Sequence, residues 1–154
     1  MQPKRNFFLN FSEIKLTYHP RIKVADRILV KNQEAATAVL RESWDSGLIN
    51  LKEQFKIILL SNSCHVMGIA DISSGGFDAT STDLRLIFAT ALKARSNNLI
   101  LAHNHPSGSL APSKEDVLLT QKIIEAGRVL HVTISDHIIM TSEGSYSMCA
   151  NDLM

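Results

Sequence analysis

The stretch HNHPSGSLAPSKED, which runs from His103 to Asp116, gathers side chains that bind metal ions and move protons. His103 and His105 are two positions apart and follow the apolar run 99–102, which is typical of a buried strand. If the strand continues to the second histidine, both imidazoles point to the same side of the sheet. They would then supply two nitrogen ligands of a tetrahedral metal site.

A third ligand follows after a turn. Pro106 ends the strand because it lacks the N–H group that a ladder needs, and residues 107–109 are typical of a turn. The chain then returns as a predicted helix whose first turn carries Asp116. His103, His105 and Asp116 match the three protein ligands of a catalytic zinc site, in which water holds the fourth position. Such an ion lowers the pKa of its water toward about 7.

Hydrolysis at such a site also needs a group that moves protons. Glu53, at the start of the strand predicted over 54–61, is the candidate general base, and it would later give the proton to the leaving amine. Ser113 could offer its hydroxyl to the oxyanion of the tetrahedral intermediate. Two structural alternatives stay open: Ser113 and Asp116 also fit a capping box, and Glu53 also fits a solvated acid at a strand edge.

The elements that must position these residues are predicted from hydrophobic periodicity and from turn residues. We expect strands over 12–18, 54–61, 65–73, 98–103, 129–135 and 137–142 and an extended or strand segment over 21–30, with 54–61 and 65–73 forming a hairpin that ends at 75–76. We expect helices over 32–45, 82–95 and 113–126, capped by Asn32 and Ser113 and stopped by Gly47 and Gly127. The alternation of strands and helices predicts an α/β fold with a mixed β-sheet flanked by helices.

Length and charge limit the classes of protein that the chain can represent. Its 154 residues are 45% hydrophobic and 20% charged, as in a single globular domain. The net charge of +1 divides into +4 over residues 1–35 (seven Lys/Arg, three Asp/Glu) and −3 over the rest (nine against twelve). We therefore expect a basic N-terminal arm or strand over 1–24 and one domain over 25–154. The arm leaves nucleic-acid contact open, but the overall charge does not favour it.

Cys64 and Cys149 belong to no CxxC pair, so they predict free thiols, as in a cytoplasmic protein, and no cysteine zinc site. No apolar run approaches the roughly 18 residues of a membrane helix, and the first residues do not form a signal peptide. The sequence does not indicate the oligomeric state.

The spacing H-x-H-x7-S-x2-D, together with an upstream glutamate, resembles the JAMM (JAB1/MPN/Mov34) metalloprotease motif. HNHPSG and PSKED are similar to the RadC-like branch, bacterial JAB-domain proteins that carry a DNA repair label. Further matching segments are KEQFKIILLSN at 52–62, ISSGG at 72–76, DLRLIFATAL at 83–92, SNNLILAHNHPSG at 96–108 and SDHIIMTSEGSYS at 135–147.

The resemblance implies a JAB1/MPN fold with the layout of cytidine deaminases and one zinc ion on His103, His105 and Asp116. It also implies a catalytic glutamate, placed at Glu53, and a supporting serine at Ser113. Asp136-His137 recurs in the family pattern, either as a polar pair at a strand start or as a hydrogen-bonding support for the site.

The chain also differs from longer RadC proteins in two ways. It does not show their N-terminal helix-hairpin-helix region, and it has Leu84-Arg85-Leu86 where they have Pro-Arg-Glu. We expect a zinc-dependent metallopeptidase or isopeptidase that acts on a peptide or protein. The alternative is a non-catalytic or DNA-associated accessory module, and replacement of Glu53 by Gln discriminates between the two.

Overall fold

A computed structural model describes residue 12, residues 14–75 and residues 82–154. Its strands form one sheet in the order β2-β1-β3-β4-β5. The strands are β1 (Gln54–Leu60), β2 (Val66–Ser74), β3 (Asn98–Asn104), β4 (Thr133–Met140) and β5 (Ser145–Ser147). The helices are α1 (Gln33–Ser43), α2 (Leu84–Lys93) and α3 (Lys114–Leu130), with 3₁₀ turns η1 (Val24–Asp26) and η2 (Cys149–Asn151).

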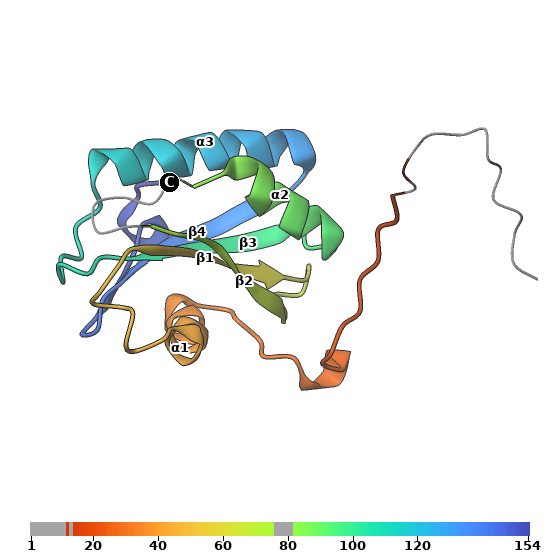
Figure 1. Ribbon diagram of the computed structural model, residues 1–154, viewed down its shortest axis with the longest axis horizontal. Coiled ribbons are helices and arrows are strands. Elements are labelled where there is room, and N and C mark those ends of the chain that lie inside the picture. Colours follow the sequence, from red (N-terminus) through yellow and green to blue (C-terminus); the bar gives the residue numbers. More distant parts are fainter. Residues whose placement is uncertain (1–11, 13, 76–81) are drawn as a thin grey trace, which may run out of the picture.

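Helices cover both faces of the sheet: α2 and α3 lie on one face and α1 lies on the other (Figure 1). Only the β3–β4 pair is parallel, and the other neighbouring strands are antiparallel, so the sheet is mixed. Each face has its own buried cluster, one built around Leu40 and Ile100 beneath α1 and one around Ile87 and Leu101 beneath α2 and α3. The predicted fold class is therefore confirmed.

The capping residues explain where two helices begin. The Asn32 side chain accepts a hydrogen bond from the N–H of Ala35 at 2.9 Å, which satisfies one of the donors that an α-helix leaves free at its start. Ser113 does the same for α3, and both caps were predicted from the sequence. The hairpin of β1 and β2 is also present, although Gly76 lies outside the described residues.

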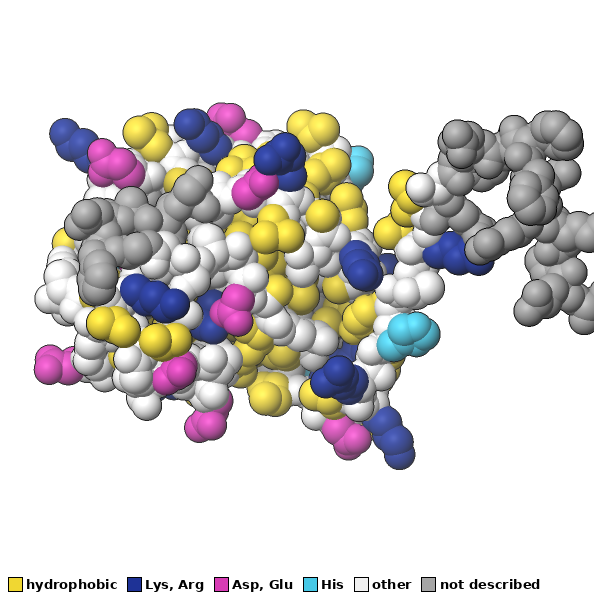
Figure 2. Space-filling view, in the orientation of Figure 1, with side chains coloured by type: hydrophobic (Ala, Val, Ile, Leu, Met, Phe, Trp, Pro, Cys, Tyr) yellow, Lys and Arg dark blue, Asp and Glu magenta, His cyan; other side chains and the backbone are white. Residues whose placement is uncertain are grey.

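The strand predicted over 12–18 is wrong, and the segment 21–30, predicted as extended or a strand, forms no regular strand. The described residues of 12–18 form no strand, and 21–30 contains η1 and a single isolated bridge between Leu29 and His65. The alternating pattern of 12–18 has no core to face, since Ile14 is 88% and Leu16 is 84% exposed. Figure 2 shows the described residues of this segment extending away from the globular body.

The end of α3 also differs from the prediction. The helix does not stop before Gly127 but continues to Leu130, and His131 is the left-handed residue that ends it, with φ of 55°. Gly127 is needed for a different reason: a Cβ atom there would lie 2.4 Å from the carbonyl oxygen of Val132. The helix takes residues 129 and 130, and the two strands predicted over 129–135 and 137–142 are one strand, β4, because Asp136 is paired within the ladder with β3.

Candidate metal centre

The register of β1 and β3 brings the predicted site residues to one edge of the sheet. Phe55 pairs with His103 in this antiparallel ladder, so Glu53, two positions before Phe55, lies across from His105 just beyond the strand ends. Side chains at alternate positions share a face, and here the shared face is the one that α3 covers. The ligand atoms of Glu53, His103 and His105 all lie within 4.8 Å of one another.

Asp116 reaches the same cluster from the first turn of α3. Its Oδ1 lies 3.2 Å from Nε2 of His103 and its Oδ2 lies 3.5 Å from Nε2 of His105. The two Nε2 atoms are themselves only 2.9 Å apart. The structure therefore brings together all three predicted metal ligands and the predicted general base, while their catalytic roles stay a prediction.

Ser113 holds Asp116 in place through a capping box. The Ser113 Oγ accepts from the N–H of Asp116 at 3.0 Å, and the N–H of Ser113 donates to Asp116 Oδ2 at 2.7 Å. The Ser113 side chain is exposed, and no described residue accepts the hydrogen of its hydroxyl. The cap is thus present, and it leaves that hydrogen available to a bound molecule.

A backbone carbonyl fixes the tautomer of His105. Its Nδ1 lies 2.8 Å from the carbonyl oxygen of Ser109, which can only accept, so Nδ1 carries the hydrogen. The turn that places this carbonyl is closed by a bond from the N–H of Gly108 to the His105 carbonyl, and Gly108 has φ of 79°. Such a φ favours glycine. In the neutral ring, Nε2 of His105 therefore presents a lone pair to the cluster.

A chain of two side chains fixes the tautomer of His103 in the same sense. The Thr120 hydroxyl donates to the carbonyl oxygen of Asp116 at 2.6 Å, a far shorter contact than the one to Met148 Sδ at 3.7 Å, so its oxygen accepts from Nδ1 of His137, also at 2.6 Å. Nδ1 of His137 then carries the hydrogen, and its Nε2 accepts from Nδ1 of His103 at 2.8 Å. The remaining nitrogen of His103, Nε2, is left with a lone pair.

In the neutral rings, two lone pairs and a carboxylate thus face one another, an arrangement that favours a positive charge between them, either a proton or a metal ion. Hydrogen bonding to Asp116 raises the pKa of His105 above its ordinary value. Burial acts to raise the pKa of Asp116, but hydrogen bonds with His103 and His105 outweigh it and hold that pKa far below the usual range. The donor set of two imidazole nitrogens and carboxylate oxygens suits a divalent transition metal such as zinc.

The centre is lined by buried groups and opens toward the surface. His103 is 3% exposed, whereas His105 and Asp116 are 13% and 16% exposed. Burial, followed by the nearby His103, lowers the pKa of His137 well below its ordinary value, so this ring stays neutral. A cation in the centre would therefore be reached from the side of His105 and Asp116.

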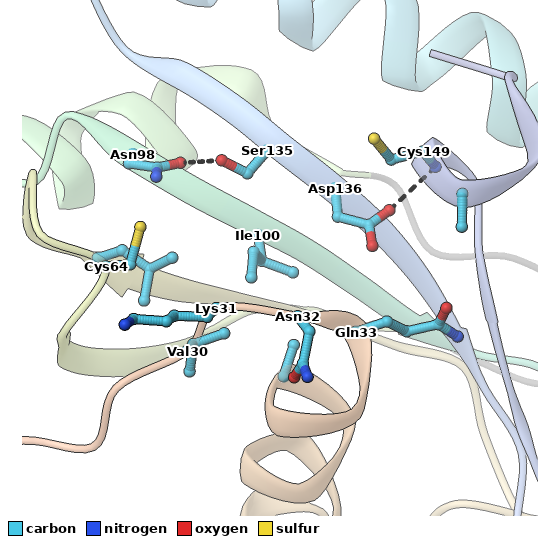
Figure 3. A pocket seen from close by; sticks show the side chains of 13 residues that line it. Val30, Lys31, Asn32, Gln33, Cys64, Asn98, Ile100, Ser135, Asp136 and Cys149 are labelled. Atoms are coloured by element: carbon cyan, nitrogen blue, oxygen red, sulfur yellow. Dashed lines mark hydrogen bonds between the residues drawn. The ribbon is translucent and has the colours of Figure 1, made fainter.

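The sequence left the role of Asp136-His137 open, and the structure separates the two residues. His137 supports the cluster, whereas Asp136 lies on the α1 face and accepts from Ser147 Oγ at 2.7 Å and from the N–H of Cys149 at 3.1 Å. Asp136 lines a separate cavity of about 320 Å³ near the start of α1 (Figure 3). Thr120 was missed altogether; its signal is its position four residues after Asp116, one helical turn along α3.

The chain therefore forms an α/β domain with a mixed sheet. Its candidate metal site is the His/His/Glu cluster at the end of a strand. The chain belongs to the RadC-like JAB domain family, whose profile matches residues 29–153. The family predicted from the motif is confirmed. No helix of the described residues is long and apolar enough to cross a membrane.

Curated relatives are found in several bacteria. A UPF0758 protein of Flavobacterium johnsoniae is 45% identical over 95 residues, covering 62% of this chain and 42% of the relative. Another from Alkaliphilus metalliredigens is 40% identical over 103 residues, covering 67% and 44%. A third, from Syntrophomonas wolfei, is 33% identical over 129 residues, covering 83% and 55%. The chain spans about half the length of the curated relatives it matches.

Proposed function

We propose that this protein is a zinc-dependent metallopeptidase or isopeptidase that hydrolyses an amide bond in a peptide or protein. One observation carries the proposal. The hydrogen bonds of His103 and His105 leave both Nε2 atoms with lone pairs 2.9 Å apart, beside the Asp116 carboxylate. Such a set of donors is stable with a cation between them, and it corresponds to the three protein ligands of an open zinc site.

The roles of the residues follow from their positions. His103, His105 and Asp116 would hold the ion. When bound, zinc supplies a Lewis acid and a water molecule that ionises near neutral pH. Glu53 stands beside the histidines without taking part in the described ion pairs of Asp116, and it would accept a proton from water and return it to the leaving amine. The Ser113 hydroxyl hydrogen would be donated to the oxygen of the scissile carbonyl.

Metal analysis tests the first part of the proposal. Protein purified without added metal should contain about one equivalent of zinc by elemental analysis, and His103→Ala and Asp116→Ala should each lose it. His19→Ala, which removes an exposed histidine of the arm, is the matched control and should keep the metal. Equal metal content in all four proteins would contradict the site, and another metal in place of zinc would correct the identity of the ion.

Glu53→Gln tests the catalytic part. The variant should keep its zinc while metal-dependent hydrolysis of a fluorogenic peptide and isopeptide library falls by at least about a hundredfold, since the amide cannot move protons. Glu125→Gln, an exposed acid of α3, is the control and should hydrolyse like the wild type. Unchanged hydrolysis in Glu53→Gln would contradict the role of Glu53 as the base. Salt-dependent DNA binding with no hydrolysis by the wild type would favour the accessory module instead.

A further inference from the structure

Asn104, the residue between the two histidines, is fully buried and points away from the metal centre. Its neighbours His103 and His105 turn toward the α3 face, so the alternation of the strand sends Asn104 to the α1 face. None of the roles proposed for the metal centre uses this side chain. Both N–H donors and the oxygen of its amide group nevertheless have hydrogen-bond partners, which is the usual requirement for a buried polar group.

All three hydrogen bonds of the amide go to the segment 49–54, which carries Glu53. The Asn104 Oδ1 accepts from the N–H of Gln54 at 2.7 Å. The Nδ2 group donates to the carbonyl oxygens of Ile49 at 2.7 Å and of Lys52 at 2.9 Å. The segment therefore depends on one side chain of β3 for bonds on both sides of Glu53.

Glu53 needs such a restraint because it lies outside the ladder of β1, which begins at Gln54. Residues 47–51 form turns, and the Glu53 carbonyl accepts from the N–H of Gly75 at 3.0 Å. That bond fixes one side of the residue, and Asn104 fixes the other. The strand β3, which carries Asn104, is paired on both sides, whereas β2, which precedes Gly75, is an edge strand, so β3 is the more rigid of the two supports.

We propose that Asn104 is a positioning residue that holds the Glu53 carboxylate at the metal centre. The inference rests on the proposed function and adds to it a link between base and ligands. His103 and His105 place the ion on one face of the strand, and Asn104 ties the base-bearing segment from the other face. The distance between Glu53 and the ion is thereby set by three consecutive residues of β3 and its end, 103–105.

Acetohydroxamic acid is the probe for this inference, because its readout does not need the natural substrate. It gives up its hydroxyl proton when its two oxygens bind zinc, and a carboxylate beside the ion accepts that proton. Its dissociation constant, measured by calorimetry on zinc-loaded protein, therefore reports whether Glu53 is in place. We expect Glu53→Gln to weaken binding by about tenfold or more, since a hydrogen bond to a charged group is lost.

Asn104→Ala should keep one equivalent of zinc and yet weaken acetohydroxamic acid to nearly the same extent as Glu53→Gln. Ser96→Ala is the matched control. It also removes a buried side chain, whose Oγ donates to the carbonyls of Leu60 at 2.8 Å and Asn98 at 3.0 Å at the opposite end of β1 and β3. It should lose thermal stability but bind the probe like the wild type. If Asn104→Ala does not fold by circular dichroism, Asn104→Ser replaces it.

The outcomes separate the inference from the function on which it rests. Weak binding in Glu53→Gln with normal binding in the Asn104 variant would overturn the inference and leave the proposed function standing. Normal binding in Glu53→Gln would overturn the role of the base and the inference together. Loss of zinc from the Asn104 variant would overturn the inference, because Asn104 would then support the histidines and not Glu53.

Discussion

Thr120 acts on the metal centre through two hydrogen bonds, without touching the position between the histidine nitrogens. Its single hydroxyl hydrogen is directed to the carbonyl of Asp116, which makes its oxygen an acceptor for His137. That choice decides the tautomer of His137 and then that of His103. A methyl group in place of the hydroxyl would leave both rings free to adopt the wrong tautomer.

Thr120→Val should therefore raise the zinc dissociation constant by about ten- to a hundredfold, the usual cost of removing a hydrogen-bonding support of a metal ligand. Competition with a chromogenic chelator measures the constant. Thr120→Ser keeps the hydroxyl and should bind zinc like the wild type. Thr90→Val removes the same kind of hydroxyl-to-carbonyl bond from α2, at 2.7 Å from Leu86, and should have no effect. An unchanged constant in Thr120→Val would contradict the relay.

Zinc affinity should also fall as the pH is lowered. The metal binds the neutral ring of His105, and the hydrogen bond to Asp116 raises the pKa of that ring. Protons therefore begin to compete with the metal at a pH above the ordinary histidine pKa of about 6.5. Asp116 has a strongly lowered pKa and stays ionised, so it contributes nothing to the slope. Zinc titrations between about pH 5.5 and 8 measure the effect. A constant affinity down to the low end of that range would contradict the assignment of His105 as a ligand.

The residues of the centre differ in how much the sequence could predict about them. His103, His105 and Asp116 fall within one short segment, so their spacing and a strand–turn–helix pattern were enough to expect them together. Glu53 was chosen as the acid at the start of a neighbouring predicted strand, but its closeness to the histidines depends on the pairing of β1 with β3, which the sequence does not specify. His137 meets His103 only because β3 and β4 pair in parallel, which periodicity alone does not specify.

At the level of elements, the first turn of α3 both stabilises the helix and positions a metal ligand. The capping box between Ser113 and Asp116 fixes the first turn of the helix and also aims the carboxylate at the histidines. From the sequence, a helix cap and a role at the metal site were both open for Ser113 and Asp116, and the two could hold together. The geometry is compatible with both, because the cap uses the lone pair of the Ser113 hydroxyl and not its hydrogen.

Ser113→Asp separates the cap from the hydroxyl. Aspartate is as good an N-cap as serine but has no hydrogen to donate, so the free energy of unfolding should change by less than about 0.5 kcal/mol. Hydrolysis should fall by about a hundred- to a thousandfold, as when a donor to the oxyanion is removed. Urea unfolding and the peptide assay give the two values. Ser113→Ala should lose the same activity and, in addition, about 1 kcal/mol of the free energy of unfolding. Full activity in Ser113→Asp would show that Ser113 acts only as a helix cap.

Element boundaries were predicted well where a local signal exists and poorly where tertiary contacts decide. Asn32 and Ser113 have side chains that cap a helix directly, so both starts were correct. The end of α3 was misplaced because Gly127 lies within the helix. A glycine is needed there since the backbone of Val132, beyond the helix end, comes too close for a Cβ atom. The alternation in 12–18 predicted a strand, but a strand forms only where an edge and a core receive it.

At the level of the whole molecule, the family profile begins at residue 29 and the core begins at Val30. The division into an arm over 1–24 and a domain over 25–154 stays a prediction. The described side chains of the arm are exposed, and Figure 2 shows dark blue Lys and Arg side chains where it meets the body. Its contribution to stability should therefore be small.

Deletion of residues 1–16 should leave the free energy of unfolding within about 0.5 kcal/mol of the wild type, as for other changes away from buried groups. Urea denaturation followed by the fluorescence of Trp44 measures this quantity. Zinc content should also stay at one equivalent. A loss of several kcal/mol would show that the arm is part of the folded domain and that the boundary at residue 24 is misplaced.

The central place of β3 has a consequence for how this protein can change over time. Pairing with β1 and β4 fixes the register of the strand. One residue inserted ahead of His103 would therefore move each following side chain to the opposite face of the sheet. The two imidazoles would then point into the hydrophobic core beneath α1, and the Asn104 amide would face the metal centre. Changes of length between related sequences should therefore be confined to the loops on either side of β3.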